Sequence, residues 1–360
     1  MLNTFIVGGG RAGLGLHWQV LRKLRDRPDT ADLWAPGQPV VWDVQDISER
    51  ARSEGLVAAR SLEHAATLAD PAETVVHLCT PPIGRFDVLR ELADLGYTRI
   101  IVEKPMTVGV TGLDAIDTLA RVRGLRLRVV SPWLASALTH ELTAQVRRGS
   151  LGALRSLSFT QSKPRWSRTL RSHDHGTAFD VELPHSIGVA LRLAGDARVV
   201  AASVTDMRIG EQVIPRMGAA RLTLRHQGGV ITEFHSDLTS PIRERRIGLR
   251  FDAGQAEGHY PISDVDHHAS LTVQEGTGAA AAAAPRLLFD DALTRYIEGA
   301  YRDYATGADR TSDDYAIARR VVQLLQDARL TASASLPETD SAPPLTGATT
   351  ALGNGASHEG

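Results

Sequence analysis

Residues 3–13 read NTFIVGGGRAG, a short apolar run followed by a glycine-rich turn. The run predicts a buried strand, and the turn matches G-x-G-x-x-G at Gly8, Gly10 and Gly13. Apolar residues then recur at helical spacing, at Leu14, Val20, Leu21 and Leu24. In this strand–turn–helix context the glycines let the backbone approach a pyrophosphate, and the helix N-terminus donates N–H groups to it. The stretch therefore predicts a dinucleotide-binding fold.

Arg11 and Ala12 lie inside the glycine-rich turn, and we expect them to contact the same cofactor. Residues 26–38 read as a loop, and a second strand over 39–43 ends in Asp43. A carboxylate at this point can accept hydrogen bonds from both ribose hydroxyls and would repel a 2′-phosphate. The sequence therefore favours NAD over NADP as the cofactor. In the alternative interpretation, Asp43 only caps the next turn.

Strands and helices alternate as far as residue 130. The predicted strands lie near 56–59, 74–79, 98–102 and 125–130, and the predicted helices begin at 48 and cover 62–68, 83–95 and 111–122. Such alternation with short links is typical of a doubly wound parallel sheet. Thr80 and Pro81 follow the strand at 74–79, where they could contact the nicotinamide half of a cofactor or only cap a helix.

The strand at 98–102 leads directly into Glu103-Lys104-Pro105. Ligands of open α/β sheets bind beyond the carboxyl ends of the strands, so Glu103 and Lys104 can meet a bound cofactor from the side. A solvated turn is the simpler interpretation of the same charges. Pro105 fixes the backbone after the lysine, with a cis Lys104–Pro105 bond as one possibility.

After residue 130 the pattern changes to strands with alternating polar and apolar positions, which indicates antiparallel strands with one wet face. They are expected near 154–162, 198–206, 218–226, 229–238 and 244–252, with helices at 139–148, 183–193, 289–306 and 312–330. We therefore expect an α/β dinucleotide-binding domain over 1–130 and an α+β domain over 131–330. Residues 276–284 read as a loose connection. Residues 331–360 have few large apolar side chains and are expected to form a disordered tail.

The composition excludes several classes of protein. The 360 residues carry a net charge of −2, which argues against nucleic acid or an anionic membrane as partners. A single cysteine, Cys79, excludes an internal disulfide framework and fits a reducing cytoplasm. We find neither a secretory signal nor an apolar run near the ~20 residues that span a bilayer.

The order of these motifs resembles the Gfo/Idh/MocA (glucose–fructose oxidoreductase, inositol dehydrogenase, rhizopine catabolism) family of NAD(P)-dependent oxidoreductases. The resemblance covers roughly residues 1–330 and rests on Gly8-x-Gly10-x-x-Gly13, Asp43, Thr80-Pro81-Pro82, Glu103-Lys104-Pro105 and a helix beginning near His185. It implies a Rossmann domain followed by a domain with a large, mostly antiparallel sheet. It also implies a sugar, cyclitol or related polyol held between the domains, with Lys104 and His185 at the reacting carbon.

The family also has an aspartate one helical turn before the histidine, where this chain has Val181. Asp180 and Glu182 flank that position, and either carboxylate could orient the imidazole of His185. We prefer Asp180, because the junction before Pro184 best tolerates a shift of one residue.

These groups suit hydride transfer between a nicotinamide and an alcohol or ketone. His185 can exchange the hydroxyl proton, and Lys104 can hold the oxygen by a charged hydrogen bond. Two alternatives stay open: a non-catalytic dinucleotide-binding sensor or regulator of the same fold, and NAD-assisted glycoside cleavage. An exposed sheet face further suggests a homo-oligomer, a dimer or tetramer.

Trp133, Lys163 and Arg165 are the remaining candidates for contact with the carbohydrate-like substrate. The basic segment 163–171 leads toward His185, which would suit an anionic sugar, but a solvated basic loop is the more ordinary interpretation. Two further clusters contain potential metal ligands: His173 with His175, and Asp264, Asp266, His267 and His268. Neither has a recognised ligand spacing, so we predict surface loops and no metal site.

Overall fold

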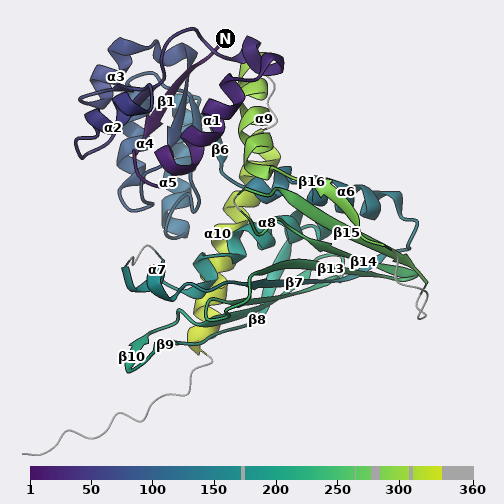
Figure 1. The fold of residues 1–360 in the computed structure, drawn as a ribbon. Coiled ribbons are helices and arrows are strands. Elements are labelled where there is room, and N and C mark those ends of the chain that lie inside the picture. The colour runs from purple at the N-terminus through teal and green to yellow at the C-terminus, as the bar shows by residue number, and fades with distance from the viewer. Residues whose placement is uncertain (172–174, 264, 277–283, 308–310, 335–360) are drawn as a thin grey trace, which may run out of the picture.

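A computed structural model describes residues 1–171, 175–263, 265–276, 284–307 and 311–334. Within them, a six-stranded parallel sheet lies in the N-terminal third of the chain, and an eight-stranded, mostly antiparallel sheet follows it (Figure 1). The predicted fold class, a Rossmann-type domain followed by an α+β domain, is confirmed.

The six-stranded sheet has the order β3-β2-β1-β4-β5-β6. Its strands are β1 (Asn3–Val7), β2 (Val40–Trp42), β3 (Val57–Ala58), β4 (Thr74–Leu78), β5 (Arg99–Val102) and β6 (Arg126–Val129). The connecting helices are η1 (Gly13–His17), α1 (Trp18–Arg25), η2 (Pro28–Leu33), α2 (Ser48–Ser53), α3 (Leu62–Leu68), η3 (Pro71–Glu73), α4 (Arg85–Asp94) and α5 (Val110–Arg123). The strand order reverses between β1 and β4, and ligands of such sheets bind at the carboxyl ends beside this switch point.

The eight-stranded sheet has the order β16-β15-β14-β13-β7-β12-β11-β8. Its strands are β7 (Leu154–Ser162), β8 (Ala197–Val204), β11 (Ala219–His226), β12 (Ile231–Asp237), β13 (Glu244–Phe251), β14 (Gly254–His259), β15 (His268–Glu275) and β16 (Arg286–Phe289). Only β7 and β12 pair in parallel. Burial alternates along β11, whose Ala220, Leu222 and Leu224 are buried, as expected for a strand with one wet face.

Helices α6 (Ala137–Arg148) and α8 (Leu183–Ala194) belong to the large core of the second half of the chain. Three short helices, η4 (Pro132–Ala135), α7 (Trp166–Arg171) and η5 (Ala178–Asp180), and a hairpin of β9 (Met207–Ile209) and β10 (Gln212–Ile214) complete it. The long helix α10 (Thr311–Ala334) contributes Val321 and Leu324 to this core and Ala318 and Val322 to the core of the first sheet. Helix α10 thus joins the two sheets.

Three local expectations need correction. Strands β14, β15 and β16 were not expected, because glycines, alanines and polar residues dilute their apolar pattern. The basic segment contains helix α7 rather than only a loop. Helix α10 continues to Ala334, past the predicted start of the tail. Residues 335–360 and most of the connection predicted at 276–284 lie outside the described residues.

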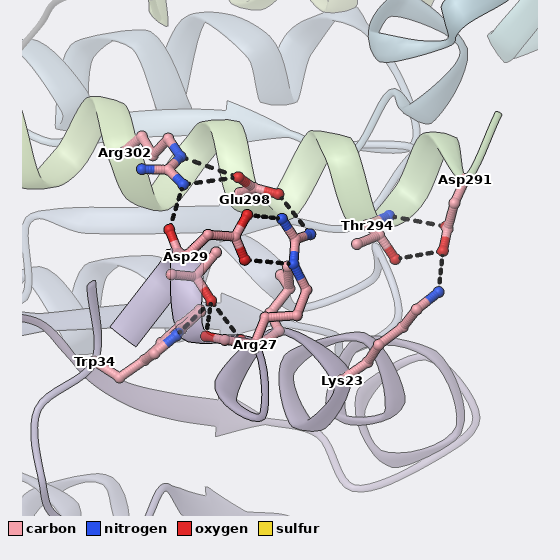
Figure 2. Close-up of polar contacts among 10 residues, drawn as sticks. Lys23, Arg27, Asp29, Trp34, Asp291, Thr294, Glu298 and Arg302 are labelled. Atoms are coloured by element: carbon pink, nitrogen blue, oxygen red, sulfur yellow. Dashed lines mark hydrogen bonds and ion pairs between the residues drawn. The ribbon is translucent and has the colours of Figure 1, made fainter. Parts of the chain in front are cut away.

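Helix α9 (Ala292–Thr306), expected in the second domain, packs against the first sheet. The hydroxyl of Tyr304 donates to the carbonyls of Ile100 and Arg126, at 3.2 and 2.8 Å. Figure 2 shows the ion pairs at the same interface, Lys23–Asp291 at 2.5 Å and Arg27–Glu298 at 3.0 Å. A segment near the C-terminus therefore completes the core formed by the first residues of the chain.

In the described part of the chain, no helix is both long and apolar enough to cross a bilayer.

Candidate active site

The glycine-rich turn leaves β1 at the switch point of the first sheet. Gly8 has a φ of +101°, which favours glycine, and a Cβ on Gly13 would lie 1.9 Å from the carbonyl oxygen of Gly8. A Cβ on Gly10 would instead meet nothing within 4 Å. Gly13 thus packs directly against the backbone of Gly8, whereas the space beside Gly10 is empty and a phosphate could approach the backbone there.

The carboxylate of Asp43 holds this turn from the end of β2. Its Oδ2 accepts from the backbone N–H of Gly9 at 2.7 Å, and its Oδ1 accepts from the N–H of Gln45 at 2.9 Å. The guanidinium of Arg50 also donates to the carbonyl of Gly9 at 3.1 Å. Asp43 therefore caps its own turn, as the simpler interpretation predicted, and also contacts the glycine-rich turn.

Arg85, at the start of α4, connects the ends of β4 and β5. Its guanidinium donates to the carbonyl oxygens of Thr80, Pro105 and, at 2.6 Å, Glu103. Burial lowers the pKa of Arg85 to about 10, opposed in part by Glu103. The Lys104–Pro105 bond between two of these carbonyls is cis.

Thr80 lies at the carboxyl end of β4, with Pro81 exposed beside it. In the described part of the chain nothing pairs with the buried Oγ1 of Thr80. An unpaired buried hydroxyl is costly, so this atom suits a polar group of a bound molecule. Together with the open face at Gly10 and the carboxylate of Asp43, it shows that these residues fit a dinucleotide.

Lys104 and His185 line the same small cavity of about 30 Å³, large enough for a water molecule. The ammonium of Lys104 donates to the carbonyl of Val181 at 3.4 Å. Burial lowers the pKa of Lys104, against the opposing effect of Glu103 and Glu182. Burial and the nearby Lys104 ammonium lower the pKa of His185 to about 3, so its imidazole is neutral near pH 7.

Of the two candidate carboxylates, Glu182 lies in the electrostatic environment of His185. Burial alone would raise the pKa of Glu182, but Lys163 and Arg245 outweigh it and lower that pKa to about 2. Lys163 forms an ion pair with Glu182, and the Nε of Arg245 lies 3.8 Å from its Oε2. The negative charge of Glu182 in turn opposes the lowering of the His185 pKa.

Asp180 has other partners. Its Oδ2 accepts from the backbone N–H and the hydroxyl of Thr177 in a capping box, and its Oδ1 accepts from Arg329 at 2.6 Å. His185 is not among the hydrogen-bond partners of Asp180 in the described residues. The preference for Asp180 as the partner of His185 therefore needs correction, because the start of η5 and helix α10 engage both of its oxygens.

A second, larger cavity of about 640 Å³ opens beside His185. Trp133 and Tyr260 stack against each other at its wall, with ring centroids 4.0 Å apart, and Trp133 also stacks on His185 at 5.8 Å. Arg11 and Glu182 line the same cavity. The glycine-rich turn, the aromatic wall and the histidine thus border one space, between helix α1 and the second domain.

Arg165 is buried, and its backbone N–H donates to the carbonyl of Leu238 at 3.0 Å. Its charge contributes to lowering the pKa values of Lys104 and Lys163, so all three cations lie in one neighbourhood. The described residues contain no group of three or more His, Cys, Asp or Glu that could hold a metal ion. His173 and Asp264, from the two clusters considered above, lie outside the described residues.

Three residues of this region were not among the candidates from the sequence: Arg85, Arg245 and Tyr260. Arg245 stands beside Arg246 in a strand with several arginines, so the sequence does not single it out. Tyr260 follows β14, a strand that the sequence did not predict. Arg85 had a usable signal, since it stands where the resembling family often carries a histidine. Two further buried residues, His17 and His77, were also missed, because each lies within an apolar pattern.

Residues 2–131 match the model of the GFO_IDH_MocA family, described as an oxidoreductase family with an NAD-binding Rossmann fold. No curated protein matches the chain. Among solved structures, KijD10, a 3-ketoreductase from Actinomadura kijaniata in complex with NADP and TDP-benzene, is 16% identical with a TM-score of 0.73. The alignment covers 92% of this chain and 97% of that one.

UDP-N-acetylglucosamine 3-dehydrogenase GnnA from Acidithiobacillus ferrooxidans is 20% identical, with a TM-score of 0.68 and coverage of 92% and 98% of the two chains. At these identities the similarity to both solved structures extends to the fold. The family assignment rests on the match over the first domain, which contains the glycine-rich turn and Glu103-Lys104-Pro105. Residues 2–131 therefore form an NAD-binding Rossmann domain of the Gfo/Idh/MocA oxidoreductase family.

Proposed function

We propose that the protein is an NAD(P)-dependent dehydrogenase or reductase that acts on a CH–OH group of a sugar, cyclitol or related polyol, or on the corresponding ketone. The observation that carries the proposal is that Lys104 and His185, both only partly exposed, line one cavity at the carboxyl edge of the first sheet. A cation and a neutral imidazole in such a place match the needs of an alcohol that must lose a proton as it loses a hydride.

In this proposal the nicotinamide supplies the hydride acceptor or donor. The ammonium of Lys104 donates a hydrogen bond to the substrate oxygen and stabilises negative charge on it as the proton leaves. The neutral imidazole of His185 accepts that proton in oxidation and returns it in reduction. Glu182 is the carboxylate that favours the protonated imidazole, because its charge opposes the lowering of the His185 pKa.

The glycine-rich turn, including Arg11 and Ala12, would hold the pyrophosphate, and Thr80, Pro81 and Glu103 would border the nicotinamide half. Asp43 supports NAD as the preferred cofactor, since its carboxylate would repel a 2′-phosphate. KijD10 was crystallised with NADP, so the cofactor test must include both dinucleotides.

The cavity of about 640 Å³ borders both the glycine-rich turn and His185, so it would hold part of the cofactor as well as the substrate. Trp133 would stack on the sugar, as aromatic faces do on apolar sugar surfaces. Lys163 and Arg165 add positive charge, which would favour a phosphate or carboxylate on the substrate. TDP and UDP appear in the names of the complexes or substrates of the two similar proteins, so sugar nucleotides belong among the compounds tested.

The test combines cofactor binding with turnover. Purified protein is incubated with NAD or NADP and a panel of polyols, free sugars, sugar acids and sugar nucleotides, and formation of the reduced cofactor is followed at 340 nm. Lys104→Met and His185→Asn should each lower kcat at least about 100-fold while NADH still binds. His259→Asn, an exposed residue of β14, is the matched control. Full turnover by both active-site variants would refute the assignment of these residues.

The second candidate function is a sensor that binds dinucleotide without catalysis. The observation that favours it is that Asp180 binds Thr177 and Arg329 instead of His185, unlike the aspartate in the family's usual arrangement. Tight NADH binding with no turnover of any compound would support this alternative. Release of a free sugar from a glycoside, without net NADH, would instead support NAD-assisted glycoside cleavage.

We also infer a homo-oligomer, because alternate residues on one face of the eight-stranded sheet stay exposed, as along β11. Sedimentation velocity would test this inference, and a monomer at micromolar concentration would contradict it.

A further inference from the structure

A row of five polar side chains crosses the interior of the first domain. The hydroxyls of Thr4 and Tyr301 lie 2.8 Å apart, and the Tyr301 hydroxyl lies 3.0 Å from Nε2 of His77. The Nδ1 atoms of His77 and His17 lie 2.8 Å apart, and Nε2 of His17 lies 3.0 Å from Oε1 of Glu103. Both histidines are 0% exposed. The row runs from β1 through α9, β4 and η1 to the end of β5.

Two nitrogen atoms at hydrogen-bond distance must share exactly one hydrogen, so one Nδ1 donates and the other accepts. The carboxylate of Glu103 only accepts, which fixes a hydrogen on Nε2 of His17. Three arrangements then satisfy every atom. With both rings neutral, all donors point from Thr4 toward Glu103. With one additional proton on the pair, the shared hydrogen lies on the Nδ1 of either ring, His77 donates from Nε2 to Tyr301, and Tyr301 donates to Thr4.

The charges around the pair favour the protonated form of His17. Burial alone would lower the pKa of His17, but Cys79 and Glu103 outweigh it and raise that pKa to about 10. Burial and the positive charge of His17 lower the pKa of His77 well below its usual value. A proton held by the pair therefore lies against the carboxylate of Glu103, whose Oε1 is 3.0 Å from Nε2 of His17.

Glu103 links this row to the active site. Its Oε1 accepts from His17, and its Oε2 accepts from the backbone N–H of Lys104 at 3.1 Å. The backbone of the same segment is held by Arg85 through the carbonyls of Glu103 and Pro105. Arg85 thus fixes the backbone on both sides of Lys104 by binding the carbonyls of Glu103 and Pro105. His17 fixes the same backbone indirectly, because it binds the Glu103 carboxylate that accepts from the N–H of Lys104.

The first turn after the glycine-rich loop gives His17 this position. Residues Gly13–His17 form a π-helical turn, in which the N–H of His17 donates to the carbonyl of Ala12 at 2.9 Å. Such turns are rare and are concentrated at functional sites. The loop expected to hold the cofactor and the residue that holds Glu103 are therefore parts of one short segment.

We propose that His17 and His77 form a proton-sharing pair that positions Glu103, and through it Lys104, and that Tyr301 connects this position to helix α9. His17 and His77 act as positioning residues that touch neither cofactor nor substrate. The effect on catalysis rests on the proposed function, whereas the hydrogen bond between the rings does not.

The first experiment tests the pair without any substrate. The full chain, labelled with ¹⁵N-histidine, is studied by NMR between pH 6 and 8, with His17→Gln and His77→Gln used for assignment. We expect a scalar coupling between the two Nδ1 nuclei across their shared hydrogen and no titration of either ring in this range. Absence of the coupling, or independent titration of both rings near pH 6.5, would overturn the proposal.

The second experiment separates positioning from mere folding. His17→Leu removes both hydrogen bonds, whereas His17→Gln keeps a donor for Glu103 and an acceptor or donor for His77. We expect kcat to fall about 100-fold in His17→Leu and to recover about tenfold in His17→Gln, with the Kd for NADH unchanged. His259→Gln on the exposed face of β14 is the control. Equal losses in both His17 variants, or losses only in thermal stability, would refute the positioning role.

A failure of the proposed function gives a different result. In that case the wild-type chain would turn over no substrate, while the coupling between the Nδ1 nuclei would still be observed.

Discussion

Replacing Arg85 with methionine tests how the carboxyl edge of the first sheet is held. The side chain is 2% exposed, and its guanidinium donates to the carbonyls of Thr80, Glu103 and Pro105. Methionine has a similar length but no donor, so all three carbonyls lose this partner. Hydrogen bonds from a charged donor contribute about 1.5–3 kcal/mol each, which gives roughly 5–9 kcal/mol for three.

The buried charge offsets part of this gain. Burial, opposed in part by Glu103, lowers the pKa of Arg85 from 12.5 to about 10. At about 1.4 kcal/mol per pKa unit, methionine recovers roughly 3 kcal/mol by removing the charge. The net loss of stability is then about 2–6 kcal/mol. At about 2–4 °C per kcal/mol for a domain of this size, the Tm should fall by at least about 4 °C.

The assay is thermal unfolding followed by circular dichroism at pH 7 without cofactor, together with NADH titration by fluorescence. Arg90→Met is the matched control, because Arg90 lies on the same helix with its side chain 57% exposed. We expect NADH to bind about tenfold more weakly to Arg85→Met, since the segments of Thr80 and Lys104 lose their common anchor. A Tm within about 2 °C of wild type, with unchanged NADH affinity, would refute the reasoning.

Gly10→Ala should fold normally but bind NADH less tightly, whereas Gly13→Ala should unfold at a lower temperature, because its Cβ would lie 1.9 Å from the carbonyl oxygen of Gly8. Thermal unfolding and NADH titration of both variants check this contrast, and equal behaviour would contradict it. Asp43→Ala should raise the ratio of kcat/KM for NADP to that for NAD; an unchanged ratio would remove Asp43 from cofactor choice. The pKa of His185 is lowered in the folded chain to about 3 from 6.5, so the unfolded chain binds more protons between these values. Stability should therefore fall as the pH drops from about 6.5, by up to about 1.4 kcal/mol per pH unit for this group, and His185→Asn should flatten that fall in unfolding midpoints measured from pH 7.5 to 5.

Much of the first domain could be predicted from the sequence, because its signals are local. Each strand is a short apolar run, and the glycine-rich turn and Glu103-Lys104-Pro105 follow such runs directly. The predicted helix at 62–68 agrees with α3 residue for residue. In the second domain the long strands with strict alternation were found, whereas β14, with Gly254 and Gly258 at buried positions, was not.

Site residues could be predicted where a local sequence motif marks them. Contacts between residues that are distant in the sequence could not be predicted. Lys104 and His185, each predicted from a single segment, line one cavity, and their roles stay predictions. The partner of Asp180 could not be read from its neighbourhood, since Arg329 is far away in the chain. The same is true of the contact between His77 and Tyr301, which depends on how α9 returns to the first sheet.

The return of helix α9 has a consequence for the order in which this chain is made. The first domain is synthesised long before Tyr296, Tyr301 and Tyr304, whose side chains are buried against it. During that interval the hydroxyl of Thr4 and the imidazole of His77 lack their tyrosine partner inside an incomplete core. A nascent Rossmann domain in this protein therefore cannot reach its final packing on the ribosome ahead of the rest. Its folding is completed only when nearly the whole chain has emerged.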